Sequence, residues 1–236
     1  MTDNDLSTII DELNSGVKQT TTFTRPLTKT VDLAIHWIAI SGPVPENYFG
    51  PCTLYLVKER PNGRYVGIIE DKGRYDLHWV VLPSHRGLHL LSTALRSVIL
   101  PHLFQDNRDE QHITVDFARL ALDNATASAR LAEAVGFIFT GISEGKHCYR
   151  LGAEAFYDVD FIDGDLSTLT DDRANEIRKL AGNCITQLKM LHSELKMAVG
   201  FTDALQEFED QLERISYSVD DIILDGYDQK RIVQVK

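Results

Sequence analysis

Apolar and polar residues alternate in short runs along residues 1–151, a pattern typical of β-strands. The runs are rich in aromatic and β-branched side chains, which favour a pleated, half-buried surface. We expect strands at 31–40, 53–59, 65–69, 75–82, 112–117, 137–142 and 146–151. Asn62-Gly63, between the second and third runs, predicts a tight hairpin turn because both residues tolerate positive φ.

Elsewhere in the same region, apolar residues recur every three or four positions, which predicts helices. We expect helices at 3–15, from Gly87 to about Phe104, and at 124–135. The residues that can cap them are Asp3 or Asn4 for the first, and Asp123 or Asn124 and then Gly136 for the third. Segment 17–30 is expected to be extended or looped, and Pro101 with the polar run 105–111 to form a loop.

This order of elements defines the fold class. Strands followed by helix, strand, helix, strand and strand predict a mixed sheet with helices on its faces, an α/β arrangement of the α+β kind. The sequence divides into an N-terminal helix and extended arm (1–27), this α/β domain (28–151) and a C-terminal helical region (152–236).

The C-terminal region has two long stretches of helical periodicity. The first carries Ile177, Leu180, Cys184, Leu188, Leu191, Leu195 and Val199, and the second carries Leu205, Phe208, Leu212 and Ile215. Gly200 separates them and Thr202 can cap the second, so we expect an antiparallel α-helical hairpin. Its apolar stripe would pack on the preceding domain or pair with another copy as a coiled coil, and both alternatives stay open.

Charge is concentrated in the same region. Residues 152–236 contain 18 Asp and Glu against 9 Lys and Arg, a balance of −9 out of a total of −11. An acidic region argues against nonspecific nucleic-acid binding and favours solubility or a basic protein partner. We therefore expect a protein partner or self-association through residues 170–217.

The composition, 43% hydrophobic and 25% charged over 236 residues, is that of a soluble globular protein. The longest apolar run, 31–40, is too short to cross a bilayer, and the polar start has no signal core. We expect no membrane partner and a cytoplasmic location. Cys52, Cys148 and Cys184 have neither zinc spacing nor a disulfide pattern, so buried reduced thiols and no metal are expected. Cys148 is the one that lies near the expected site.

The strongest functional signal is the turn Pro83-Ser-His-Arg-Gly87, between a predicted strand and a predicted helix. Such a turn directs backbone N–H groups and the positive end of the helix dipole at one point, which suits a phosphate group. His85, Arg86 and His89 surround it with basic side chains. The alternative is a plain surface turn with Arg86 at the start of the helix.

The strand–turn–helix unit, followed by Asn124 and by Ala129-Arg-Leu-Ala-Glu-Ala-Val-Gly-Phe137, resembles the GNAT acyltransferase superfamily over about residues 28–151. The resemblance implies a GNAT-like fold that binds acetyl-CoA. Backbone amides of an Arg/Gln-x-x-Gly-x-Gly/Ala turn would hold the pyrophosphate, and the pantetheine would pair with the preceding strand. The residues thus assigned to the cofactor are Val81, Leu82, Arg86, Gly87, Leu88, His89, Leu90, Leu91 and Asn124.

The cofactor motif is divergent. Arg86 takes the first motif position, but His89 and Leu91 stand at the two positions that the family fills with glycine or alanine. Ala132 stands where many members have the tyrosine that protonates the departing thiolate. Tyr149 on the last predicted strand is a replacement acid, and a buried structural tyrosine is the alternative reading of it.

A general base must take a proton from the attacking amine. In the family it is often a carboxylate, or a water held there, on the strand before the turn, which makes Asp76 and His78 the candidates. Both lie on the strand face opposite Leu77 and Trp79. The alternatives are a solvated Asp76 and a His78 that is hydrogen-bonded on a sheet face. The amine is unknown, and loops 41–51 and 105–111 are expected to surround it.

Two functions follow from the resemblance. The first is an acetyl-CoA-dependent N-acyltransferase acting on an amine, weak or inactive where the motif has diverged. The second is a GNAT-like scaffold without catalysis, a structural or adaptor subunit, for example in the virion of a tailed phage. The sequence leaves open whether the chain is an enzyme.

Overall fold

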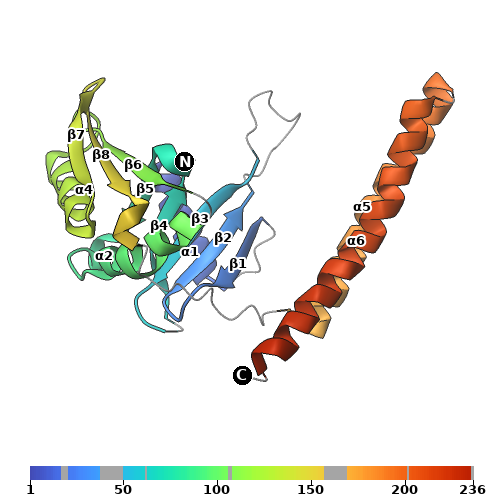
Figure 1. Cartoon of the computed structure of the whole chain (residues 1–236), viewed down its shortest axis with the longest axis horizontal. Helices are drawn as coiled ribbons and strands as arrows, with labels where there is room; N and C mark the ends of the chain where they lie inside the picture. Colours follow the sequence, from blue (N-terminus) through green and yellow to red (C-terminus); the bar gives the residue numbers. More distant parts are fainter. Residues whose placement is uncertain are drawn as a thin grey trace. The chain divides into compact units, whose positions relative to one another are not determined.

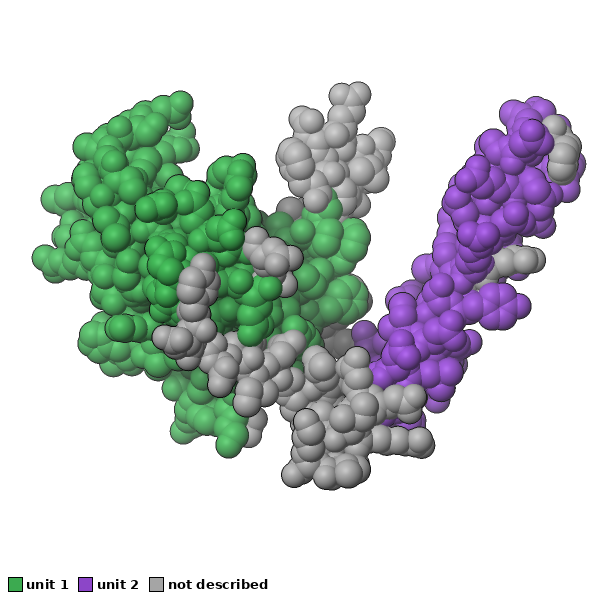
Figure 2. All heavy atoms as spheres, viewed as in Figure 1, with its two compact units in different colours: residues 1–165 green, residues 166–236 purple. Residues whose placement is uncertain are grey.

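The computed structural model describes residues 1–16, 21–37, 50–61, 63–105, 108–156, 169–200 and 202–234. They belong to two compact units, residues 1–165 and 166–236, coloured separately in Figure 2. The first unit contains, in order, α1 (Asp3–Asn14), β1 (Thr22–Pro26), β2 (Val31–His36), β3 (Cys52–Lys58), β4 (Tyr65–Asp71), η1 (Gly73–Tyr75), β5 (Leu77–Val81), η2 (Pro83–His85), α2 (Leu90–Ala94), η3 (Leu95–Ile99), α3 (Leu100–Gln105), β6 (Glu110–Val115), α4 (Leu122–Val135), β7 (Ile138–Ser143), β8 (Lys146–Gly152) and η4 (Ala153–Phe156). The second contains α5 (Asp171–Val199) and α6 (Asp203–Gln234).

The strands of the first unit form two antiparallel sheets, ordered β1-β2-β3-β4-β5 and β6-β8-β7 (Figure 1). The α+β class that the sequence predicts is confirmed. A finer detail differs, because the described strands form two antiparallel sheets and not one continuous mixed sheet. The two sheets meet where β5 contacts β6.

Both faces of the larger sheet are covered. Side chains alternate along β3, so that Leu54 and Leu56 pack on one side and Tyr55 and Val57 on the other. Helix α1 covers the first side with Leu6, Ile9 and Ile10. The second side holds the main core, built with α2, η3, α3, α4 and the inner residues of the smaller sheet.

Several boundaries differ from the sequence predictions. Helix α1 is capped by Thr2, in a capping box with Asp5, and not by Asp3 or Asn4. The segment expected to be extended or looped contains strand β1, which pairs with β2. Strand β2 ends at His36, and residues 38–40 lie outside the described residues.

The hairpin between β3 and β4 is confirmed, but its loop is wider than a two-residue turn. Glu59 N–H donates to Arg64 O (3.1 Å), and Gly63 N–H donates to Arg60 O (2.9 Å). Gly63 does not adopt positive φ. Asn62, the other residue on which that prediction rests, lies outside the described residues.

The central helix is not the single run from Gly87 that the spacing predicts. It begins at Leu90 and runs to Gln105, with the π-helical turn η3 in its middle, where Leu100 N–H bonds Leu95 O five residues back. Pro101, predicted in a loop, follows that turn inside α3. Proline has no N–H and clashes with the carbonyl four residues earlier, so the wider π turn accommodates it.

Three further boundaries differ. Strand β5 begins at Leu77, after the turn η1, and β6 begins at Glu110, inside the expected loop. Helix α4 begins at Leu122 with Ala121 at its N-cap and no side-chain cap, so Asp123 and Asn124 lie in its first turn. Gly136 ends this helix at φ 109°, as the sequence predicts.

The C-terminal hairpin is confirmed and longer than predicted, since α6 continues to Gln234. Thr170 caps α5, and Thr202 Oγ1 accepts the N–H of Leu205 (3.2 Å). Cys184 is exposed on α5, which corrects the expectation of a buried thiol, because α6 covers only one side of that helix. Cys52 and Cys148 are partly buried and free.

No helix within the described part of the chain is long and apolar enough to span a membrane. The described residues also contain no group of three or more His, Cys, Asp or Glu side chains that could hold a metal ion. The cytoplasmic location stays a prediction.

Candidate functional site

The predicted phosphate turn is a loop of two parts between β5 and α2. Its first part is the 3-10 turn η2, closed by Arg86 N–H donating to Pro83 O (3.4 Å). In its second part Gly87 (φ 76°) and His89 (φ 58°) both adopt the left-handed conformation. For a histidine this conformation costs about 1–2 kcal/mol. The strained His89 places the helix start three residues later than predicted.

The helix start leaves backbone donors free of helical acceptors. Its first intrahelical bond is from Thr93 N–H to His89 O (3.0 Å). The amides of Leu90, Leu91 and Ser92 therefore have no acceptor within the helix. The Leu91 side chain is 7% exposed and packs in the core, so it does not obstruct the loop. Leu88 is 58% exposed.

Arg86 connects this loop to the start of α4. Its Nη1 donates to Asn124 Oδ1 (3.2 Å), and its Nε donates to Val81 O (3.3 Å). Three residues that the sequence assigns to the cofactor, from two distant segments, thus meet in one place, which we call the Arg86 bridge. Both acceptors are neutral oxygens, so neither compensates the positive charge of the exposed guanidinium.

The strand register explains why Val81 O is available to Arg86. Leu82 N–H donates to Val66 O (2.9 Å), and Val81 lies opposite Gly67. In an antiparallel pair bonded and non-bonded positions alternate, so the N–H and C=O of Val81 point away from β4. This is the free backbone edge that the resemblance assigns to the pantetheine arm. In this structure the Arg86 side chain bonds its last carbonyl.

Polar contacts hold β6 against the start of β5, at the end of β5 away from the Arg86 bridge. Asp76 Oδ1 accepts the N–H of Thr114 (3.0 Å), and Gln111 Nε2 donates to Gly73 O (3.1 Å). Next to them, Arg108 makes a two-pronged ion pair with Asp71 (2.9 and 3.1 Å). Burial raises the pKa of Asp76. The Asp76 carboxylate therefore has a structural partner, at the end of β5 away from the Arg86 bridge.

His78, the other predicted base, lies under α1. Its Nε2 is 2.7 Å from Asp3 Oδ1, and its Nδ1 is 3.5 Å from Glu70 Oε2. Glu70 also accepts from the amino group of Met1 (3.1 Å). The nearby Glu70 carboxylate raises the pKa of His78 despite burial, and Asp3 adds to the shift. An imidazole held between two carboxylates positions α1 on the sheet and is not free to accept a proton from a substrate.

Tyr149, the predicted replacement acid, is 2% exposed in the main core. Its ring meets Phe139 edge to face (centroids 5.5 Å apart), and burial raises its pKa. Ala132 is fully buried in the same core. The alternative reading of Tyr149, a structural tyrosine, agrees with this packing. Among the described residues, no hydrogen bond or ion pair connects the Arg86 bridge to Asp76, His78 or Tyr149.

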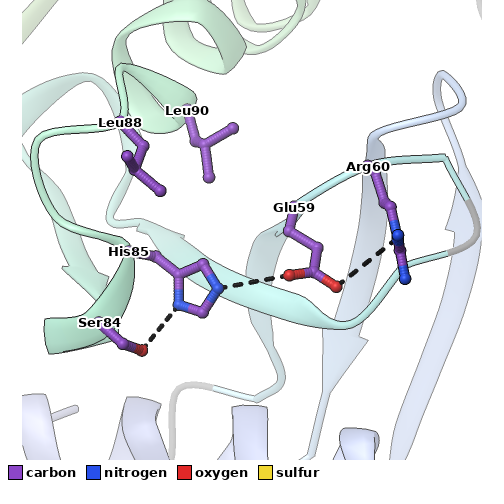
Figure 3. Close-up of a pocket in the computed structure, with 6 residues that line it drawn as sticks. All are labelled: Glu59, Arg60, Ser84, His85, Leu88 and Leu90. Carbon is purple, nitrogen blue, oxygen red and sulfur yellow. Dashed lines mark hydrogen bonds and ion pairs between the residues drawn. The ribbon is translucent and has the colours of Figure 1, made fainter.

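A hollow of about 380 Å³ lies beside the same loop (Figure 3). It is lined by Glu59, Arg60, Ser84, His85, Leu88 and Leu90. His85 lies between Ser84 Oγ (2.9 Å from Nδ1) and Glu59 Oε2 (3.4 Å from Nε2). A smaller hollow of about 150 Å³ continues along α2 and includes His89. Arg86 and Asn124 line neither hollow.

Sequence reasoning missed Glu59 and Ser84. The signal was present in the charged triplet Lys58-Glu59-Arg60, which ends β3 next to the hairpin loop. Of the loops expected to surround the acceptor, 41–49 and 106–107 lie outside the described residues.

A scan against protein-family models and a search of curated proteins gave no match. Among solved structures, the chain is similar to a putative GnaT-family acetyltransferase from Bordetella pertussis (18% identity, TM-score 0.32, 42% of this chain and 65% of that one). It is also similar to the spermidine/spermine N-acetyltransferase SpeG from Vibrio cholerae in complex with manganese ions (15% identity, TM-score 0.35, 46% and 69%). A third similar structure is RimJ from Mycobacterium smegmatis in complex with CoA-disulfide (19% identity, TM-score 0.35, 46% and 56%). At these identities and TM-scores the likeness carries no conclusion about the reaction, which has to be judged from this chain's own residues.

The residues at the loop fit a phosphate-bearing ligand better than they fit acid–base catalysis. The Arg86 guanidinium is exposed, and a guanidinium is well suited to bind phosphate. A Cβ added at Gly87 would meet nothing within 4 Å, so the space beside the loop is open. The CoA pyrophosphate is an anion of the kind that this loop could hold.

Proposed function

We propose that the first unit is an acetyl-CoA-dependent N-acyltransferase that transfers an acyl group to an amine. The observation that carries the proposal is the Arg86 bridge, which joins the end of β5, the loop before α2 and the start of α4. These are the places that the GNAT resemblance assigns to the cofactor. Arg86 would exchange Asn124 for a phosphate oxygen, since a charged acceptor makes the stronger bond.

When bound, acetyl-CoA supplies an acyl group activated as a thioester. Arg86 and the amides at the start of α2 would neutralise and orient the phosphates, and release of Val81 O would free the strand edge for the pantetheine arm. Neither His78 nor Tyr149 is available as an acid or base at the bridge, because both have structural contacts elsewhere. Catalysis would then rest on positioning, and without proton transfer by the protein it would be about 10²–10⁴-fold slower.

Thermal unfolding with added CoA or acetyl-CoA tests the binding step. A ligand at about 100 times its dissociation constant should add about 2.7 kcal/mol of stability. We expect Arg86→Ala to lose most of the shift and His78→Gln to keep it, since His78 lies under α1. Release of free thiol from acetyl-CoA in the presence of a panel of amines then tests transfer.

A second candidate function is a catalytically inactive GNAT-like scaffold that serves as an adaptor subunit, for example in a virion or another assembly. The specific observation in its favour is that the predicted acid–base residues are held in structural contacts. The absence of a thermal shift at CoA concentrations a few times higher than about 1 mM would contradict the enzyme proposal and favour the scaffold. A shift without thiol release for any amine would support an acyl-CoA-binding protein that does not catalyse transfer.

A further inference from the structure

The C-terminal hairpin has a fixed antiparallel register. The contacts that set it are Arg178 with Asp220 (2.8 Å), Asp171 with Tyr227 (2.8 Å), and the rings of His192 and Phe208 (centroids 6.0 Å apart). The two residue numbers of each pair add up to between 398 and 400. Residues of α5 and α6 whose numbers add up to about 399 therefore lie at the same level of the hairpin.

Each helix carries two apolar stripes. The inner stripes, Ala174, Ala181 and Leu188 on α5 and Leu205, Leu212 and Val219 on α6, are buried or half-buried. The outer stripes follow three residues later, at Ile177, Cys184 and Leu191 on α5 and at Phe208, Ile215 and Ile222 on α6. Leu191 is 45% exposed, Ile215 42% and Ile222 68%, Cys184 is exposed as well, and Ile177 and Phe208 are half-buried.

The two outer stripes lie on the same side of the hairpin. Two antiparallel helices that face each other are related by a two-fold axis normal to the plane that contains them. An equal offset of three residues on each helix therefore turns both stripes toward the same side. The register places them level with each other, as Ile177 with Ile222, Cys184 with Ile215 and Leu191 with Phe208. Together with the exposed Leu180 and Leu195, these residues form what we call the apolar face.

We infer that two copies of the chain associate through this apolar face and form an antiparallel four-helix bundle. The face has apolar residues at three matched levels seven residues apart, which is the spacing of packed helical bundles. A two-fold axis parallel to the helices brings each level against the same level of the second copy. The face is thus complementary to itself, a property that neither the acyltransferase nor the scaffold proposal requires.

The size of the face is sufficient for a stable dimer. Helix α5 has 29 residues and is therefore about 43 Å long. Two helices side by side present a strip about 20 Å wide, so the contact would bury about 1,700 Å² from both copies together, within the range of stable protein interfaces.

Charge selects the arrangement of the two copies. Helix α5 contains 5 Lys and Arg against 4 Asp and Glu, a balance of +1, whereas α6 contains 3 against 9, a balance of −6. Contact between the two α6 helices would place like charges side by side, which is unfavourable. The two-fold axis parallel to the helices avoids this, because it places each α5 beside α6 of the second copy.

Sedimentation equilibrium of the full chain tests the inference, with two adjacent residues as a matched pair. Leu191 belongs to the apolar face, whereas the neighbouring Met190, 64% exposed, points away from both α6 and that face. We expect the unaltered chain to have twice the mass of one chain. Leu191→Glu should raise the dimer dissociation constant at least about tenfold, and Met190→Glu should change it less than about twofold.

A second measurement does not depend on a variant that folds. Because a dimer dissociates when it unfolds, the thermal midpoint of the helical circular dichroism signal should rise with protein concentration in the unaltered chain. A monomer at about 100 µM, an assembly larger than a dimer, or equal effects of Leu191→Glu and Met190→Glu would each overturn the inference. A monomer in which Leu191→Glu lowers stability independently of concentration would show instead that the face packs within its own chain.

Discussion

The two units of the chain use their apolar residues in opposite ways. In the first unit the larger sheet is covered on both sides, and side chains such as Leu95 and Ile99 are fully buried. In the hairpin, Leu180 and Ile222 are more than 60% exposed on one side of a single layer. A stable architecture needs two packed layers around a core. The first unit is therefore complete as a folding unit, whereas the hairpin by itself is a single layer.

The two units also differ in what their charges do. In the first unit, His78 and Arg108 are partly buried and paired with carboxylates that hold elements together. In the hairpin, the ion pair of Arg178 with Asp220 is largely exposed to solvent, where such pairs contribute little. Arg86 stands apart from both groups, because it is exposed and its partners are neutral. We therefore expect Arg86 to be a charge of the first unit that meets a ligand.

The largest expected effect is that of a cavity in the main core. Leu95→Ala removes a fully buried side chain and should cost about 3–4 kcal/mol of the free energy of unfolding. Leu180→Ala, at a concentration where the chain is monomeric, should cost less than about 0.5 kcal/mol. Both tryptophans, Trp37 and Trp79, belong to the first unit, so urea unfolding followed by tryptophan fluorescence measures that unit.

Equal effects of Leu95→Ala and Leu180→Ala would contradict the comparison, because they would mean that the outer face of the hairpin is as well packed as the core. Helical circular dichroism should report mainly the hairpin, because α5 and α6, with 29 and 32 residues, are the longest helices described. Two transitions at different urea concentrations are therefore expected from the two signals.

A smaller effect is expected at the junction of the two sheets. Asp71→Asn would leave the positive charge of Arg108 without its carboxylate, at a site where both side chains are less than 15% exposed. We expect a loss of about 2–3 kcal/mol in the same urea experiment. The double variant Asp71→Asn/Arg108→Gln removes both charges and should lose less than Asp71→Asn alone. A double variant that is less stable than either single one would show that the pair does not act as a unit.

Much of the fold was predictable from sequence periodicity. The strands on each side of the Arg60–Arg64 loop, the helix ending at Gly136 and the C-terminal hairpin all follow from local patterns. The errors arose where a tertiary contact outcompetes a local preference. Asn124 is a good capping residue, but its side chain accepts a hydrogen bond from Arg86, and the helix begins without a side-chain cap.

The site was predictable only in part. The GNAT resemblance assigns Arg86 and Asn124 to the same cofactor site, although they are distant in sequence. The roles of His78 and Tyr149 could not be predicted, because burial depends on which element covers a strand face. His78 is covered by α1, where its contact Asp3 lies 75 residues away in sequence. The hollow at Glu59 and His85 is formed by two segments distant in sequence, so the charged triplet at Glu59 does not predict it by itself.

The smallest effect concerns pH. The nearby Glu70 carboxylate raises the pKa of His78 above its unfolded value. A raised pKa means that the stabilisation is complete below the unfolded value of about 6.5 and is lost as the pH rises through the folded value. The urea midpoint of the first unit should therefore fall between pH 6 and pH 8, and fall less in His78→Gln.

Glu70 acts in the opposite direction at lower pH. Burial raises the pKa of Glu70, but His78 and the amino group of Met1 lower this pKa by more. The stabilisation from Glu70 is therefore lost only as the pH falls below the normal range of a glutamate. The comparison is therefore best made above about pH 5.5, where Glu70 stays ionised. An equal decline in the unaltered chain and in His78→Gln would show that His78 does not link α1 to the sheet.

The measurement that tests the central claim most directly is a calorimetric titration of CoA and of pantetheine, which has no phosphate groups. If Arg86 binds the pyrophosphate, CoA should bind at least about tenfold more tightly than pantetheine, and Arg86→Ala should weaken CoA binding by a similar factor without weakening pantetheine binding. Equal affinities for the two ligands, or CoA binding that survives Arg86→Ala unchanged, would contradict the assignment.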